Sequence, residues 1–93
     1  MVPSDLPLLK EAITKYGIRS QLDLAQEECA ELIVAISHCK RDRPNSTNEV
    51  IEEIADVRIM VTQLSIIFGE ENVDKIVIEK LTRLKQILKQ KEK

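Results

Sequence analysis

The strongest constraint on the fold is how rarely this chain contains residues that stop a helix. Its 93 residues include only two glycines and three prolines, and 32% of them are charged. Such a composition is typical of an α-helical protein rather than a β protein. The stops fall at Gly17, at the loop-like sequence of residues 41–46 and at Gly69. We therefore predict an all-α protein whose helices are divided at these three points.

Apolar residues recur at helical spacing between these stops. They predict a short N-terminal helix and three long helices, over residues 5–16, 20–41, 47–68 and 70–90. Ser20 and Asp23 have the spacing of a capping box, which we expect to begin the second helix. Ser46 and Glu49 repeat that spacing before the third helix. The short connections favour an antiparallel helical bundle in a single domain over residues 1–93.

The last predicted helix carries an apolar stripe at nearly heptad spacing, formed by Val73, Val77, Leu81, Leu84 and Leu88. Such spacing suits packing lengthwise against another helix. A bundle of this size also leaves a large fraction of its apolar surface uncovered. We therefore expect self-association to complete the bundle, in a homo-oligomer.

Charge and cysteine content limit the partners and the compartment. The net charge is −2 and only the C-terminal lysines are close together, so we expect no nucleic-acid partner. No apolar run approaches the length that spans a membrane, and the N-terminal sequence lacks the pattern of a secretory signal. Cys29 and Cys39 lack the spacing of a metal or redox motif, which favours reduced thiols. We expect a cytoplasmic protein with no membrane partner.

One acidic pattern occurs twice in the chain. Two acidic residues, an apolar residue, Ala, an acidic residue and an aliphatic residue follow one another in residues 27–32 and again in residues 52–57. At about 100° per residue, the second acidic residue of each pattern falls within or beside the apolar arc of its helix, and the third falls at its edge. Four carboxylates are therefore expected to face the bundle interior: Glu28, Glu31, Glu53 and Asp56.

Carboxylates in such positions need compensation, because an ionised group without a partner is costly to remove from water. Side chains three residues apart lie on one helix face, so each acidic pair can reach one ion or two adjacent ions. A single pair is usually solvated surface, so the prediction depends on its duplication. All-oxygen ligation favours Mg²⁺, with Mn²⁺ as the alternative, and His38 is not in the register of a di-iron site. We expect Glu27 and Glu52, farther round their helices, to support the ligands or to face solvent.

The acidic motifs resemble the signature of the MazG-like all-α nucleoside triphosphate pyrophosphohydrolases, in which EExxE is followed later in the chain by ExxD. Here Glu27, Glu28 and Glu31 match the first element, and Glu53 and Asp56 match the second. The similarity extends over residues 20–88 and includes the sequence IADV around Asp56 and the sequence EKLTRLKQ of residues 79–86.

The resemblance implies a Mg²⁺-dependent hydrolase that cleaves an NTP, a dNTP or a related nucleotide to the monophosphate and pyrophosphate. It also implies a homodimer or a homotetramer, and it implies that Glu28, Glu31, Glu53 and Asp56 bind the metal. Bound metal lowers the pKa of a water molecule that attacks phosphorus. A carboxylate not fully engaged by metal can take the proton, and we expect Glu28 or Glu31 to be that general base.

The last helix departs from the family pattern. Leu84 occupies the place where many members have an Asn near the nucleotide. Lys80 and Arg83 are the candidate phosphate contacts, although an exposed pair of cations is equally typical of an ordinary surface. Two alternatives to an enzyme therefore stay open: a non-catalytic helical module that binds nucleotide or metal, and a plain oligomerisation bundle.

The remaining chemically notable residues are expected to be structural. Tyr16 and Phe68 are the only aromatic residues, and aromatic side chains usually serve in packing. A lone histidine near a helix end, as at His38, is usually structural or solvated. Cys29 lies between two glutamates that disfavour its thiolate, so we expect no nucleophilic role for it.

Overall fold

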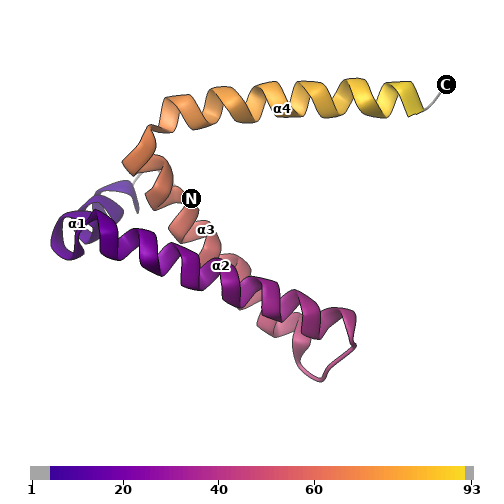
Figure 1. The fold of residues 1–93 in the computed structure, drawn as a ribbon, viewed down its shortest axis with the longest axis horizontal. Coiled ribbons are helices and arrows are strands. Elements are labelled where there is room, and N and C mark those ends of the chain that lie inside the picture. Colours follow the sequence, from indigo (N-terminus) through magenta and orange to yellow (C-terminus); the bar gives the residue numbers. More distant parts are fainter. Residues whose placement is uncertain (1–4, 92–93) are drawn as a thin grey trace.

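The computed structural model describes residues 5–91, and in that range the chain forms four α-helices and no strand. Figure 1 shows their arrangement: α1 (Leu6–Tyr16), α2 (Ile18–Lys40), α3 (Ser46–Phe68) and α4 (Glu70–Lys91). The all-α prediction is confirmed, and each helix begins and ends within two residues of its predicted bounds.

The two glycines stop the helices as predicted. Gly17 has φ +89°, and its N–H donates to the Ile13 carbonyl oxygen at 2.9 Å, which ends α1. Gly69 has φ +113°, and its N–H donates to the Ser65 carbonyl oxygen at 2.8 Å, which ends α3. Positive φ is strained for residues with a Cβ atom and accessible to glycine, so both turns depend on the missing side chain.

The two predicted capping boxes do not begin their helices. Ser20 lies inside α2, which starts directly after its N-cap residue, Gly17, with no side-chain cap hydrogen bond. Ser46 is the first residue of α3, and its N-cap is Asn45 in a left-handed conformation with no side-chain cap hydrogen bond. Asn45 instead accepts a hydrogen bond from the side-chain amide of Asn48 at 2.8 Å. Backbone geometry, rather than serine hydroxyls, therefore sets both starts.

Helices α2 and α3 lie side by side as a hairpin closed by the short loop of residues 41–45 (Figure 1). Their contact is lined by buried Ala25 and Ala35 of α2 and by buried Met60 of α3. Alanine allows two helix backbones to approach closely, which brings the polar side chains along this seam within reach of one another. Helix α1 packs across one end of the hairpin through buried Leu9. This hairpin is the frame that positions the acidic motifs.

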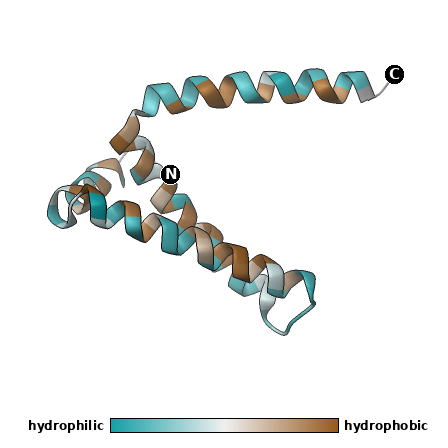
Figure 2. Ribbon diagram, in the orientation of Figure 1, coloured by the Kyte–Doolittle hydropathy of each residue, from teal (hydrophilic) through white to brown (hydrophobic). Residues whose placement is uncertain are grey.

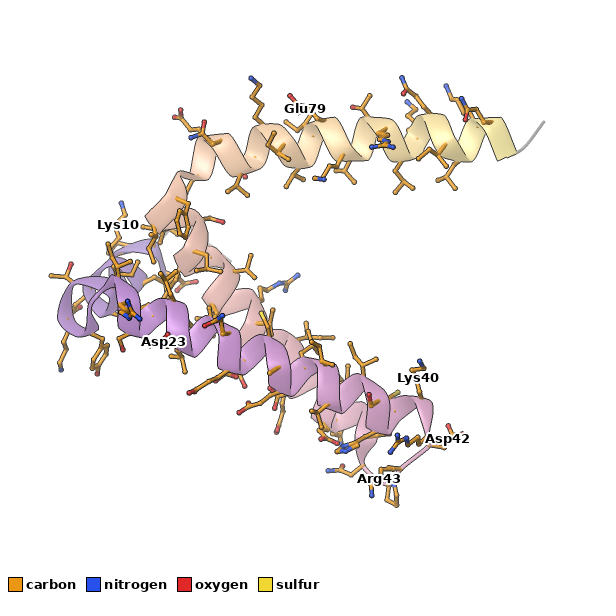
Figure 3. The ribbon with its side chains drawn as sticks, in the orientation of Figure 1. Lys10, Asp23, Lys40, Asp42, Arg43 and Glu79 are labelled. Carbon is orange, nitrogen blue, oxygen red and sulfur yellow. The ribbon has the colours of Figure 1, made fainter. Side chains whose placement is uncertain are left out.

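Helix α4 leaves the hairpin at Gly69 and, among the four described helices, makes contact only with α3 (Figure 1). The radius of gyration is 16.5 Å, against about 12 Å for a compact domain of this length. Figure 3 shows the α4 side chains projecting into solvent along its length, with Glu79 on the side away from the hairpin. Three long helices side by side, the arrangement expected from the sequence, are therefore not present within one chain.

Apolar side chains remain exposed on α4 and on the hairpin. Figure 2 shows hydrophobic segments recurring along α4, where Leu81 is 59% exposed and Leu88 is 52% exposed. Tyr16 and Phe68, expected to pack, are 59% and 64% exposed, because none of the described helices covers them. None of the described helices is long and apolar enough to cross a membrane.

Candidate metal centre

Three carboxylates meet at the seam between α2 and α3. Glu28 comes from α2, and Glu53 and Asp56 come from α3. Each offers one oxygen, and these oxygens all lie within 4.8 Å of one another. Because oxygens at this separation can ligate one ion, the carboxylate triad of Glu28, Glu53 and Asp56 could hold a metal.

Two of the three carboxylates are partly withdrawn from water. Glu28 and Glu53 are half-buried, whereas Asp56 is exposed. Within residues 5–91, the Oε2 atoms of Glu28 and Glu53 are each buried without a hydrogen-bond partner. A buried acceptor without a partner is unfavourable, and more so when it carries charge. The geometry thus leaves two oxygens that a proton or a cation would satisfy.

The electrostatics of the triad favour the same conclusion. Burial raises the pKa of Glu28, and the negative charges of Glu31, Asp56 and Glu53 raise it further. Burial likewise raises the pKa of Glu53, followed by the charges of Glu31 and Asp56. Loss of hydration and like charge both disfavour the ionised form of a carboxyl group. A divalent cation would remove both penalties at once.

Glu31 lies beside the triad rather than within it. It is exposed, and it lines a cavity of about 260 Å³ together with Glu49 and Glu53. Its charge contributes to the raised pKa of both half-buried glutamates, so it is close to each of them. The structure therefore brings Glu31 to the same cluster, at its solvent side.

Glu49 also belongs to this cluster, although it was not among the predicted site residues. His38 Nδ1 lies 3.0 Å and 3.2 Å from the two carboxylate oxygens of Glu49, so His38 donates a hydrogen bond that ties the end of α2 to the start of α3. Glu49 also lines the cavity beside Glu31. A signal was present, because Glu49 precedes Glu53 by four residues and so shares its helix face. The spacing of Glu49 from Ser46 instead suggested a capping box at the start of the helix.

The other predicted site residues do not join the triad. Glu27 and Glu52 are exposed and lie outside the group of converging oxygens. Lys80 and Arg83 are exposed on α4, which makes no contact with α2 in the described part of the chain. Within one chain, then, the acidic cluster and the basic pair are separate.

The opposite side of the hairpin is more apolar. A cavity of about 570 Å³ there is lined by apolar side chains that include Leu22 and Cys29 of α2 and Leu64 and Phe68 of α3. Its lining also includes Arg19, Asp23 and Gln26 of α2. Cys29 precedes Glu31 by two residues, which places it about 200° away around the helix. We call the side with Glu31 the acidic face and the side with this cavity the apolar face.

No protein-family model, curated protein or solved structure matches this chain. The resemblance to the MazG-like enzymes therefore rests on the acidic motifs of α2 and α3 and on their sequence context. The possible chemistry of these motifs follows from the geometry of Glu28, Glu53 and Asp56.

Proposed function

We propose that this protein is a Mg²⁺-dependent pyrophosphohydrolase that cleaves an NTP or dNTP to the monophosphate and pyrophosphate. The observation that carries the proposal is the convergence of Glu28, Glu53 and Asp56 at the α2–α3 seam. Two of their oxygens are buried without a hydrogen-bond partner among the described residues, and a bound cation would supply one. The acidic motifs that supply these residues are also those that resemble the MazG-like family.

The donor set fits a hard divalent cation. All the converging atoms are carboxylate oxygens, which suit Mg²⁺ or Mn²⁺ better than zinc or iron. Glu31 adds a fourth carboxylate at the solvent side of the cluster. When bound, Mg²⁺ would neutralise phosphate charge and acidify a water molecule. A net negative cluster would not bind a triphosphate without such an ion, because like charges repel.

Different carboxylates would bind the metal and accept the proton. Glu28, Glu53 and Asp56 would hold the cation, and Glu31, at the solvent side of the cluster, would accept the proton of the attacking water. Attack forms a bond between the water oxygen and the α-phosphorus, and the bond from that phosphorus to the bridging oxygen of the pyrophosphate breaks. Glu28 is the alternative base, because it lies close to Glu31 in the same acidic cluster.

A homodimer or a homotetramer completes the fold in this proposal. The accessible surface of the chain is 7606 Å², whereas a compact monomer of 10.6 kDa exposes about 5,500 Å². The excess of roughly 2,000 Å² per chain is in the range that obligate dimers bury. Neighbouring copies would cover the stripe of α4 and the apolar face, and would form the helical bundle that one chain lacks. Contacts from Lys80 and Arg83 to phosphate would then come from a neighbouring chain.

The decisive test is hydrolysis by the folded protein. A panel of canonical and modified triphosphates is incubated with Mg²⁺, and pyrophosphate release is measured. We expect Glu53→Gln to reduce turnover by about 100-fold or more, because it removes a metal ligand. Glu52→Gln is the matched control, since it makes the same change at the adjacent, exposed position. Absence of pyrophosphate with every substrate, from protein with native helix content, would refute the proposal.

A second candidate is a helical module that binds Mg²⁺ and nucleotide without turnover. The observation that favours it is the separation of Lys80 and Arg83 from the triad in one chain. It predicts a melting temperature that rises with Mg²⁺ and nucleotide while no pyrophosphate forms. A plain oligomerisation bundle predicts neither effect.

A further inference from the structure

A second cavity opens on the acidic face, nearer to α1. Its volume is about 410 Å³, within the range of small-molecule sites. Helix α1 contributes Tyr16 to its lining, α2 contributes Gln21 and Leu24, and α3 contributes Ile59 and Gln63. No charged side chain lines it. A neutral, largely apolar cavity with a few amide groups suits an uncharged ligand and does not suit phosphate.

The two glutamines are unusual because they are buried in a chain that buries very little. Gln21 and Gln63 are each only 4% exposed. The Gln63 Oε1 atom is buried and has no hydrogen-bond partner in the part of the chain that the structure describes. Buried polar atoms are normally paired, and an unpaired one is destabilising. A ligand that donates a hydrogen bond from within the cavity would supply the missing partner.

The cavity and the carboxylate triad are aligned along both helices. Gln21 precedes Glu28 by seven residues, and Gln63 follows Asp56 by seven residues. Seven residues are close to two helical turns, so each pair lies on one line about 10 Å apart along its helix. Because α2 and α3 run in opposite directions, both steps lead from the triad toward the same end of the hairpin. A ribose and its first phosphate are of a size to bridge such a separation.

We propose that this cavity holds the nucleobase of the nucleotide whose phosphates the carboxylate triad binds through its metal. The inference rests on the proposed function and adds the base-recognition site to it. A glutamine side chain offers one acceptor and two donors, which match the alternating edge of a nucleobase. The Tyr16 ring, exposed at the mouth of the cavity, can stack on the face of the base, while Leu24 and Ile59 provide apolar contacts.

Nucleosides test the cavity without phosphate or metal. Uridine, cytidine, adenosine and inosine are titrated into the protein in EDTA, and the side-chain amide signals of its glutamines are followed by NMR. We expect at least one nucleoside to shift the signals of Gln21 and Gln63 saturably, with a Kd on the order of 1 mM or below. Gln26, which lines the cavity on the apolar face, should not shift, and ribose should shift none of them. Nucleosides that leave Gln21 and Gln63 unperturbed would overturn the inference.

A matched pair of variants separates recognition from folding. Gln63→Met keeps the side-chain volume and removes the unpartnered oxygen, so we expect the melting temperature to rise or stay equal while nucleoside affinity falls about tenfold. Gln26→Met makes the same substitution on the other side and should change neither quantity. Unchanged nucleoside affinity in Gln63→Met would refute the inference.

Activity distinguishes failure of the cavity from failure of the proposed function. If NTPs are hydrolysed, Gln63→Met should raise KM for the NTP and leave KM for inorganic tripolyphosphate unchanged, since tripolyphosphate has no base. Equal effects on both substrates would overturn the base site and leave the hydrolase in place. Nucleoside binding at Gln21 and Gln63 without any hydrolysis would support the site and reject the proposed function.

Discussion

The α2–α3 hairpin and helix α4 break the usual rules of burial in opposite ways. The hairpin withdraws carboxylate oxygens of Glu28 and Glu53 from water without partners. Helix α4 leaves large aliphatic side chains such as Ile78 and Leu81 exposed, at 65% and 59%. Each region is unfavourable for an isolated chain, but the missing partner differs. A cation would compensate the buried carboxylate oxygens of the hairpin, and another protein surface would cover the exposed aliphatic side chains of α4.

Breaking the apolar stripe of α4 should have the largest effect. We expect the double substitution Leu81→Asp and Leu84→Asp to dissociate the assembly into monomers, because burial of each leucine contributes roughly 1.5–3 kcal/mol. Light scattering coupled to size exclusion measures the change in mass. The control is Thr82→Asp with Gln86→Asp, which adds the same charge on the other side of α4. Dissociation by the control, or an intact assembly in the stripe variant, would show that α4 is not the contact.

Neutralising the hairpin carboxylates should separate folding from metal binding. We expect Glu28→Gln to raise the melting temperature of the metal-free protein, because it removes repulsion within the triad. The same variant should lose most of the stabilisation that Mg²⁺ gives to the native protein. Thermal unfolding with and without Mg²⁺ measures both effects, with Glu27→Gln as the exposed control. A lower melting temperature without metal would mean that Glu28 stabilises the fold through some other contact.

The pH dependence of stability should report on the two half-buried glutamates of the hairpin. Because folding raises the pKa of Glu28 and Glu53 above their ordinary value of 4.5, the folded state binds protons more tightly than the unfolded chain. The stability that these protons provide is present at low pH and is lost as the pH rises through the raised values. Metal-free protein should therefore become less stable as the pH rises above about 4.5 and through the raised pKa values, while stabilisation by Mg²⁺ should increase. Thermal unfolding at each pH tests this, and the double variant Glu28→Gln with Glu53→Gln should show a weaker dependence on pH.

The smallest expected effect concerns the closed end of the hairpin. The His38 and Glu49 side chains are 25% and 38% exposed, so their interaction is partly screened by water. We expect His38→Ala to lower the free energy of unfolding by about 0.5–1 kcal/mol. A double-mutant cycle with Glu49→Ala, measured by chemical unfolding, isolates the pairwise contribution. A coupling energy near zero would mean that the contact does not stabilise the hairpin.

The sequence predicted those features that depend on local chemistry. The helix bounds follow from apolar spacing and from Gly17 and Gly69, whose conformational freedom is a property of the residue itself. Periodicity alone placed Glu28, Glu53 and Asp56 within or beside the apolar arcs of their helices, and in the structure their carboxylate oxygens converge. Apolar periodicity describes one helix at a time and does not predict how two helices are aligned.

Features that depend on the register between helices were not predictable in this way. The pairing of His38 with Glu49 requires knowing how the loop of residues 41–45 aligns α2 with α3. The burial of Gln21 and Gln63, which line a cavity with Tyr16, also depends on how the helices pack and could not be read from the sequence. The direction of α4 depends on two backbone angles at Gly69, which no apolar pattern encodes.

Gly69 makes the position of the far end of α4 sensitive to small backbone rotations. The helix has 22 residues and is therefore about 33 Å long, so a rotation of about 10° at Gly69 would carry its far end through roughly 6 Å. A Cβ atom at this position would meet the Asn72 side chain at 3.0 Å and would also disfavour φ +113°. Small changes at one glycine would thus be magnified into a different spacing between the subunits of an assembly built on α4.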